Sequence, residues 1–190
     1  MKKFKVAIFA SGSGSNAEEI FTHFKDHPDI QITLLLSNNA SAFALERAKR
    51  FNVATHVFSK QQFRESEIVL EWLREAGITH VVLAGFLWLV PDYLIKAFPH
   101  QIINIHPALL PKFGGAGMYG MKVHQAIKDQ GETETGITIH EVNEHYDEGK
   151  IVFQATCKVD PGDTPEQIAA NVHQLEYKHY PMVIENWIKG

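Results

Sequence analysis

The sequence has little of what marks a disulfide-rich, membrane-spanning or nucleic-acid-binding chain. Its 190 residues include one cysteine, Cys157, which excludes an internal disulfide framework and a zinc site built from cysteines. No apolar run approaches the roughly 20 residues that a membrane-spanning helix needs. Basic residues form no stripe, and the formal net charge of −4 argues against nucleic-acid binding. We therefore expect a cytoplasmic protein with no nucleic-acid or membrane partner.

What the chain does have is a regular alternation of short apolar runs and amphipathic segments of helical length. The predicted strands of the first half cover residues 5–10, 31–37, 54–58, 80–84 and 102–105. Ser41 is expected to cap one of the intervening helices, and Pro91 to lie in the first turn of another. This alternation predicts an α/β fold with a doubly wound, mostly parallel sheet.

After residue 111 the pattern changes. A glycine-rich loop, GGAGMYG, leads to a predicted helix at about residues 123–129. Two strand-like runs, GITIHEVN and KIVFQATCKV, are joined by the short EHYDEG, which predicts an antiparallel extension of the sheet. A last helix is expected to start near Thr164 and to break or kink at Pro181. Residues 1–190 are thus expected to form one domain, whose halves, 1–100 and 101–190, share a sheet.

The loop SGSGSN, residues 11–16, separates the first strand from the first helix. Glycines permit a tight turn there, and the helix N-terminus presents unpaired N–H groups to an anion. The run GSGSNA also fits the dinucleotide fingerprint, but the second strand ends in SNN, with no carboxylate for a ribose. A phosphate site is favoured over a plain turn, and an NAD-dependent oxidoreductase stays an alternative. The residues expected to hold the phosphate are Ser13, Gly14, Ser15 and Asn16.

Asn104 and His106, in the run INIHPALLP, are two residues apart at the end of a predicted strand. They should project on one side, at the edge where doubly wound sheets bind ligands. The turn in EHYDEG can bring Asp147 to them, and a carboxylate stabilises an imidazolium. An amide donor beside such a histidine suits oxyanion stabilisation and proton transfer in acyl transfer. The alternative is a hydrogen-bonded core histidine.

Covalent catalysis and metal binding are not expected. The sequence has no GxSxG motif, and its cysteine falls inside a predicted strand, so direct transfer to an incoming nucleophile is favoured. It also has no HExxH motif, and its 11 histidines are scattered.

Over essentially its whole length the chain resembles the folate-dependent formyltransferases. The resemblance rests on six motifs in order: SGSGSN, SNNASAFALERA, VVLAGFLWLVP, INIHPALLPKF, GITIHEVNEHYDEGKIVFQ and VHQLEYKHYP. Within the family, SGSGSN and LEYKHYP are typical of enzymes that formylate glycinamide ribonucleotide. The resemblance implies a Rossmann-like fold and transfer of a formyl group from 10-formyltetrahydrofolate to 5′-phosphoribosylglycinamide in purine biosynthesis. It also implies a monomer or homodimer without a metal.

The resemblance also implies roles for individual residues. Residues 1–100 would bind the phosphate, and residues 101–190 would carry the folate and catalytic groups. The implied catalytic residues are Asn104, His106 and Asp147. The C-terminal helix would add His173 and Glu176 to the ribonucleotide site. The implied folate-binding residues are Arg64, Leu87, Trp88, Leu89, Val90, Asn104, Val142, Asn143 and Asp147, with Arg64 paired to the glutamate tail.

Three features depart from the common family pattern. Trp88 stands where an arginine is usual, and His173 stands where glutamine or lysine is often found. The loop KFGGAGMYGMKVHQA is a few residues longer than usual. A formyltetrahydrofolate deformylase shares the core motifs and stays an alternative, whereas the acidic balance disfavours a methionyl-tRNA formyltransferase.

Overall fold

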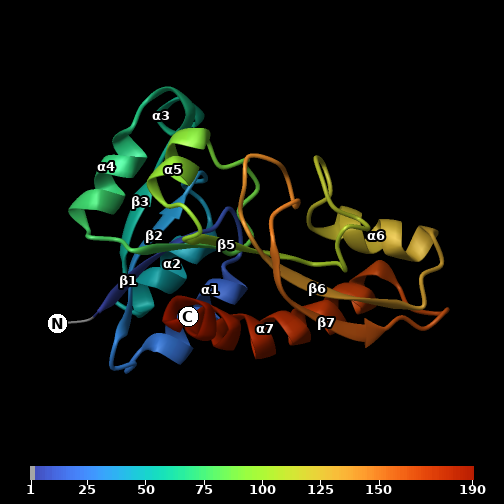
Figure 1. Ribbon diagram of the computed structural model, residues 1–190. Coiled ribbons are helices and arrows are strands. Elements are labelled where there is room, and N and C mark those ends of the chain that lie inside the picture. The colour runs from blue at the N-terminus through green and yellow to red at the C-terminus, as the bar shows by residue number, and fades with distance from the viewer. Residues whose placement is uncertain (1–2) are drawn as a thin grey trace.

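A computed structural model describes residues 3–190, which build a seven-stranded sheet with helices on both faces (Figure 1). The strands lie in the order β3-β2-β1-β4-β5-β6-β7. Their bounds are β1 Phe4–Phe9, β2 Ile30–Ser37, β3 Ala54–Val57, β4 His80–Leu83, β5 Ile102–His106, β6 Glu134–Glu141 and β7 Ile151–Lys158. The first five strands are parallel to one another, and β6 pairs antiparallel with both β5 and β7. This confirms the predicted doubly wound sheet with an antiparallel extension.

Seven helices connect and cover the strands within the described residues. They are α1 Ser15–Phe24, α2 Phe43–Arg50, α3 Lys60–Glu65, α4 Ile68–Glu75, α5 Asp92–Ala97, α6 Met121–Asp129 and α7 Pro165–Lys189. The helix α3 was not predicted because its only buried residue is Phe63, too little for an amphipathic period. A capping box between Ser59 and Gln62 defines its start.

Two predictions about helix ends were wrong. Ser41 does not cap α2, which begins after Ala42 without a side-chain cap. The side-chain oxygen Oδ1 of Asn39 accepts hydrogen bonds from both the backbone N–H and the hydroxyl of Ser41, so this hydroxyl bonds Asn39 instead of the helix N-terminus. Pro91 is the residue before α5 rather than part of its first turn.

Pro181 does not end α7, contrary to the prediction. The helix continues from Pro165 to Lys189, with Thr164 as its N-cap. A proline inside a helix removes one backbone hydrogen bond. Here Pro181 is buried beside Tyr180 and Ile184, so packing against the sheet offsets that loss.

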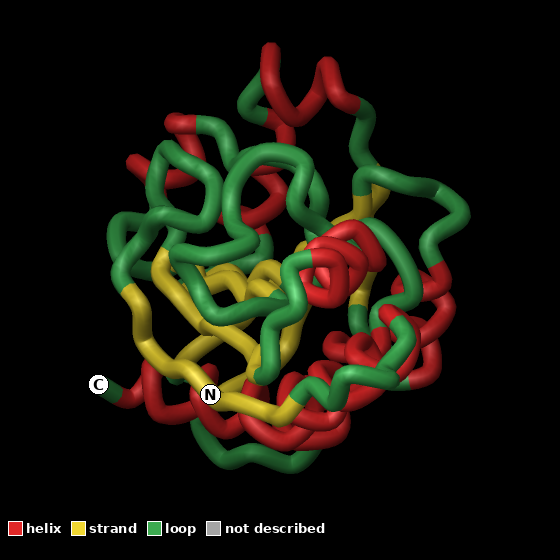
Figure 2. Tube along the Cα trace, turned by 90° about the vertical axis from the view of Figure 1, so that its right-hand side faces the viewer, coloured by secondary structure: helices red, strands yellow, loops and turns green. Residues whose placement is uncertain are grey.

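Alternate residues of the central strand supply two hydrophobic cores, one on each face of the sheet. Val6 and Ile8 pack with α1, α2 and α7, whereas Ala7 and Phe9 pack with α3, α4 and α5. Figure 1 shows these two groups of helices on opposite sides of the strands, and Figure 2 shows the strands between helices after a quarter turn. Helices on both faces explain why the central strands are mostly apolar, whereas the edge strand β3 is largely exposed.

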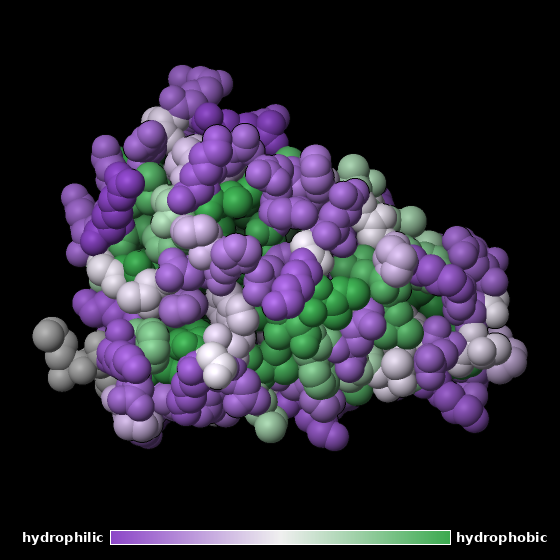
Figure 3. All heavy atoms as spheres, viewed as in Figure 1, coloured by the Kyte–Doolittle hydropathy of each residue, from purple (hydrophilic) through white to green (hydrophobic). Residues whose placement is uncertain are grey.

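The surface is mixed rather than uniformly polar. On the face in Figure 3, hydrophilic side chains cover the helices, and apolar side chains are exposed where β6 and β7 lie above α7. Ile151, at the start of β7, is 46% exposed. Among residues 3–190, no helix has both the length and the apolarity to cross a membrane.

A buried hydroxyl joins α7 to the strands that carry the site. Tyr180 is fully buried, and its hydroxyl donates to the Leu83 carbonyl at 2.8 Å, with the Ile103 carbonyl at 3.4 Å. Burial raises the pKa of this hydroxyl well above 10, so it remains a donor. The contact fixes α7 against β4 and β5.

Replacing Tyr180→Phe should lower the free energy of unfolding by about 1–2 kcal/mol, because a buried hydrogen bond is lost with little change in shape. Urea denaturation measures this difference. The control is Tyr177→Phe on the same helix. Tyr177 is half-buried, and its hydroxyl makes no hydrogen bond to any described residue. Equal losses in the two variants would contradict the assignment.

Candidate active site

An open cavity of about 440 Å³ lies at the carboxyl ends of β1, β4 and β5. The strands β1 to β3 are added toward one edge of the sheet, and β4 and β5 toward the other. The strand order thus reverses between β1 and β4, and doubly wound sheets bind ligands at this point. Further walls come from the loop at 115–120, the start of α6, residues 145–147 and α7. Segments from both halves of the chain therefore face one volume.

Most of the predicted site residues line this cavity. The structure brings together Ser13, Gly14, Ser15, Asn16, Leu87, Trp88, Leu89, Val90, Asn104, His106, Val142, Asp147, His173 and Glu176. Arg64 does not line it, because α3 packs with α4 and the Arg64 side chain is exposed. Asn143 does not line it either, and its side-chain oxygen Oδ1 accepts from the backbone N–H of His145 at 3.0 Å. The folate-binding roles of these two residues stay predictions.

The loop at 11–16 has the geometry of an anion site. Gly14 adopts φ +73°, and a Cβ there would lie 2.5 Å from the Cβ of Ala44, so only glycine fits. The backbone N–H groups of residues 12–16 have no acceptor among the described residues. They face the cavity at the N-terminus of α1, where unpaired N–H groups favour negative charge.

A buried carboxyl group lies beside this loop. Glu176 of α7 is 6% exposed and accepts from the Asn16 amide at 2.9 Å. Burial raises the pKa of Glu176, although the bond from Asn16 and the nearby His173 act in the opposite direction. The end of β2 carries no carboxylate, and the Asn39 amide there donates to the Ser11 carbonyl at 3.3 Å. The ribose contact expected of an NAD site is thus missing.

The three predicted catalytic residues meet in the cavity. Nδ1 of His106 lies 3.5 Å from the Asp147 carboxylate, and Nε2 lies 2.8 Å from the Phe113 carbonyl oxygen. Both neighbours are acceptors and favour an imidazolium. Burial nevertheless lowers the pKa of His106, and Asp147 and Phe113 offset this only in part. The sequence-based expectation of a protonated His106 took into account only the nearby carboxylate, whereas burial favours the neutral ring.

Asp147 connects His106 to the glycine loop. Its carboxylate accepts from the Gly115 N–H at 3.0 Å and lies 3.6 Å from Nε2 of His140. Burial raises the pKa of Asp147, but His140, His106 and Gly115 together lower it below its usual value. The carboxylate therefore stays ionised near neutral pH. Its backbone is in the left-handed region, at φ +56°.

His140 belongs to the site but was not predicted. It lies opposite Asn104 in the antiparallel pairing of β5 with β6. Its Nδ1 lies 2.8 Å from the Glu141 carbonyl oxygen, and its Nε2 lies 3.1 Å from the Asn104 amide nitrogen. The ring thus contacts both Asn104 and Asp147. The antiparallel pairing implied by GITIHEVN was the available signal.

His124, at the start of α6, was also missed. It is 2% exposed and lines the cavity, and its Nδ1 has no hydrogen-bond partner among residues 3–190. Burial first, and then His173 and His106, lower the pKa of His124 to about 4. The ring of His173 lies 6.4 Å away in an edge-to-face arrangement. No motif in the sequence marked this residue.

One wall of the cavity is apolar and aromatic. The indole of Trp88 packs against Phe58 and Phe63, with ring centroids 6.0 and 5.9 Å away. Leu87 is 45% exposed, and its backbone N–H donates to the Ser11 hydroxyl at 3.1 Å. A flat aromatic ligand can lie on this surface with backbone groups at its edge.

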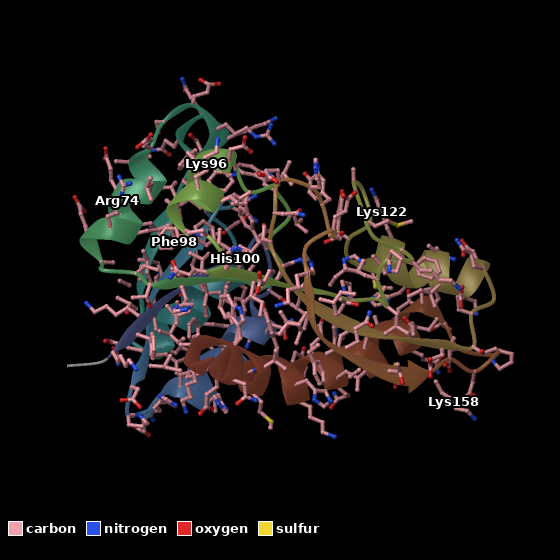
Figure 4. The ribbon with its side chains drawn as sticks, in the orientation of Figure 1. Arg74, Lys96, Phe98, His100, Lys122 and Lys158 are labelled. Carbon is pink, nitrogen blue, oxygen red and sulfur yellow. The ribbon has the colours of Figure 1, made fainter. Side chains whose placement is uncertain are left out.

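The described lining contains no lysine or arginine. Of the cations labelled in Figure 4, Arg74, Lys96 and Lys158 are exposed and do not line the cavity, and Lys122 lies on the outer side of α6 near Tyr119. In the described lining, the groups that can bind an anion are therefore backbone N–H groups, histidines, and hydroxyl or amide donors such as Ser13 and Ser15. In the part of the chain that the structure describes, no group of three or more His, Cys, Asp or Glu could hold a metal ion.

Comparison with known proteins identifies relatives of the whole described fold. The formyl transferase family matches residues 4–184. The phosphoribosylglycinamide formyltransferase of Bacillus subtilis is 37% identical over 97% of this chain and 94% of its own length. The chloroplastic enzyme of that name from Arabidopsis thaliana is 40% identical over 96% of this chain. This chain spans only 65% of the Arabidopsis protein and 61% of a Vigna unguiculata relative.

Solved structures agree with the sequence relatives. The phosphoribosylglycinamide formyltransferase from Brucella melitensis superposes with a TM-score of 0.88 at 34% identity, covering 100% of this chain and 97% of that one. The enzyme from Streptococcus pneumoniae gives 0.86 at 33% identity, covering 99% of both chains.

The His124 environment predicts how stability depends on pH. Between its usual pKa of 6.5 and about 4, the unfolded chain binds a proton that the folded chain excludes. The free energy of unfolding should therefore fall as the pH is lowered through this window. The contribution of His124 should be about 1–3 kcal/mol.

Urea denaturation of the wild type and of His124→Gln, at about pH 7 and about pH 4.5, measures this contribution. The His124→Gln variant should lose less stability on acidification than the wild type does. Part of the pH dependence of stability should remain, because burial also lowers the pKa of His106. Exposed His100, labelled in Figure 4, provides the control variant His100→Gln, which should behave as wild type. An unchanged pH dependence in His124→Gln would refute the assignment.

Proposed function

The chain belongs to the formyl transferase family, and on that premise we propose that it transfers a formyl group from 10-formyltetrahydrofolate to the amine of 5′-phosphoribosylglycinamide. One observation carries the proposal: Asn104, His106 and Asp147 meet in the same cavity as an anion-binding loop. The names of the relatives from Bacillus subtilis and Arabidopsis thaliana support the choice of substrates.

The phosphate of the ribonucleotide would bind the backbone N–H groups of residues 13–16. His173 and Glu176 face the same part of the cavity from α7 and would contact the ribose or the glycinamide. Glu176 is already oriented by Asn16, so it can accept hydrogen bonds from hydroxyl or amide groups without rearranging. These contacts would aim the amine toward the catalytic residues.

The folate would occupy the apolar wall. Backbone groups of residues 87–90 can bind the polar edge of the pterin, and Val142 faces it from the other side. Trp88 offers an aromatic surface in place of the usual arginine. The folate contacts at this position would thus depend on stacking rather than on charge.

In the chemical step, the neutral glycinamide amine attacks the formyl carbon and a C–N bond forms. The Asn104 amide and Nε2–H of His106 would stabilise the oxyanion of the tetrahedral intermediate. The attacking nitrogen loses a proton, and N10 of the folate gains one as the C–N10 bond breaks. The ionised Asp147 would assist this transfer, releasing formylated ribonucleotide and tetrahydrofolate.

The test is the absorbance change as 10-formyltetrahydrofolate is consumed, with and without 5′-phosphoribosylglycinamide. Turnover that requires the ribonucleotide is the expected result. Equal turnover without it would replace the proposal by a deformylase. Reduction of NAD by a small substrate, with no formyl transfer, would indicate an oxidoreductase.

Asn104→Ala and His106→Ala should each lower kcat by about 100- to 1000-fold, because each removes an oxyanion donor. Steady-state assays at saturating substrate measure this loss, with circular dichroism to verify folding. The control is Asn171→Ala, an exposed position on α7 outside the cavity lining. A folded His106→Ala variant with near-wild-type kcat would disprove its role.

A further inference from the structure

The carbonyl oxygens of the anion loop all have donors on the side of α2 or within α1. The Ser11 carbonyl accepts from the Asn39 amide at 3.3 Å, and the Gly12 carbonyl accepts from the Ala44 N–H at 3.1 Å. The Ser13 carbonyl accepts from Nε of Arg47 at 2.9 Å, and the Gly14 carbonyl from the first turns of α1. No loop carbonyl from residue 11 to 14 is left without a donor.

These contacts determine where the loop N–H groups point. In a trans peptide the carbonyl and the following N–H point in opposite directions. Holding the Ser13 carbonyl on the α2 side therefore aims the Gly14 N–H at the cavity. Glycine adopts positive and negative φ about equally readily, so the φ of +73° at Gly14 does not by itself hold the preceding peptide in one orientation. A rotated peptide would present an oxygen to the anion in place of an N–H.

Arg47 is the only charged side chain among these donors, and it is itself held in place. Its guanidinium bonds the Glu18 carboxylate and lies 4.9 Å from the centroid of the Phe43 ring. Its side chain is 20% exposed. Because Glu18 offsets its charge, the main effect of Arg47 on the loop is through geometry rather than through long-range attraction.

We propose that Arg47 is a positioning residue for the substrate phosphate, acting through the Ser13 carbonyl. This rests on the proposed function, because it assigns the anion to the ribonucleotide. Arg47 does not line the cavity and does not touch the phosphate. It keeps the Gly14 N–H directed at the phosphate, so its loss weakens ribonucleotide binding without altering the catalytic residues.

The chain offers a matched control on the same helix. Arg50 lies 5.4 Å from the same Phe43 ring and 3.9 Å from the same Glu18 carboxylate, but it makes no contact with the loop. Arg50→Ala therefore removes a cation from the same surroundings without freeing the Ser13 carbonyl.

Arg47→Ala should raise KM for 5′-phosphoribosylglycinamide about 10-fold, the equivalent of one charge-assisted hydrogen bond. Both kcat and the KM for 10-formyltetrahydrofolate should change less than about twofold. Arg47→Lys keeps the charge but lacks the Nε donor and the planar fork, so it should restore only part of the affinity. Arg50→Ala should behave as wild type.

A substrate without the phosphate separates positioning from a general structural role. With the dephosphorylated glycinamide ribonucleoside, Arg47→Ala and wild type should have the same kcat/KM. Equal losses with both substrates, or no change in KM, would overturn the inference. If Arg47→Ala does not fold by circular dichroism, the same comparison with Arg47→Lys decides.

Calorimetric binding of ribose 5-phosphate tests the inference without turnover. Wild type should bind it more tightly than Arg47→Ala does, and Arg50→Ala should match wild type. If the wild type does not formylate the ribonucleotide yet shows this difference, the proposed function fails and the role of Arg47 stands. Equal binding in wild type and Arg47→Ala overturns the role of Arg47, whatever the activity.

Discussion

The site depends on one buried carboxylate that joins three parts of the chain. Asp147 contacts His106 at the end of β5, His140 in β6 and the Gly115 N–H of the long loop. Removing a carboxylate from water is costly, and these three partners together outweigh that cost, since they keep its pKa below the usual value. The left-handed backbone at residue 147 persists because the same contacts determine its position.

The proposed phosphate site would rely on fixed backbone dipoles rather than on flexible cations. No lysine or arginine lines the described cavity, so a phosphate would meet backbone N–H groups at the start of α1. Such donors lose little conformational entropy on binding, provided that the loop already has the right shape. The shape comes from outside the cavity, through Asn39, Ala44 and Arg47. The buried Glu176 next to this loop adds an acceptor for the neutral parts of the same ligand.

The sequence predicted the sheet well because alternating strands and helices leave few topologies, and strand ends of one sheet converge at one edge. That reasoning also located Asn104 and His106. The same reasoning missed residues whose place in the site depends on strand register or on distant packing. His140 joins the site because it pairs with Asn104 across the sheet. His124 lines the cavity because of the path that the long loop takes to α6. Pro181 shows the same limit, since local propensity predicted a break that packing of α7 overrides.

The long glycine loop is hydrogen-bonded to both His106 and Asp147. The Phe113 carbonyl accepts from Nε2–H of His106, and the Gly115 N–H donates to the Asp147 carboxylate. Three glycines at positive φ, at positions 115, 117 and 120, give this loop a path that other residues rarely follow. An oxyanion that binds Nε2–H must share that proton with the Phe113 carbonyl or displace it. On the proposed mechanism, substrate binding and the position of the loop would therefore be coupled at a single nitrogen atom of His106.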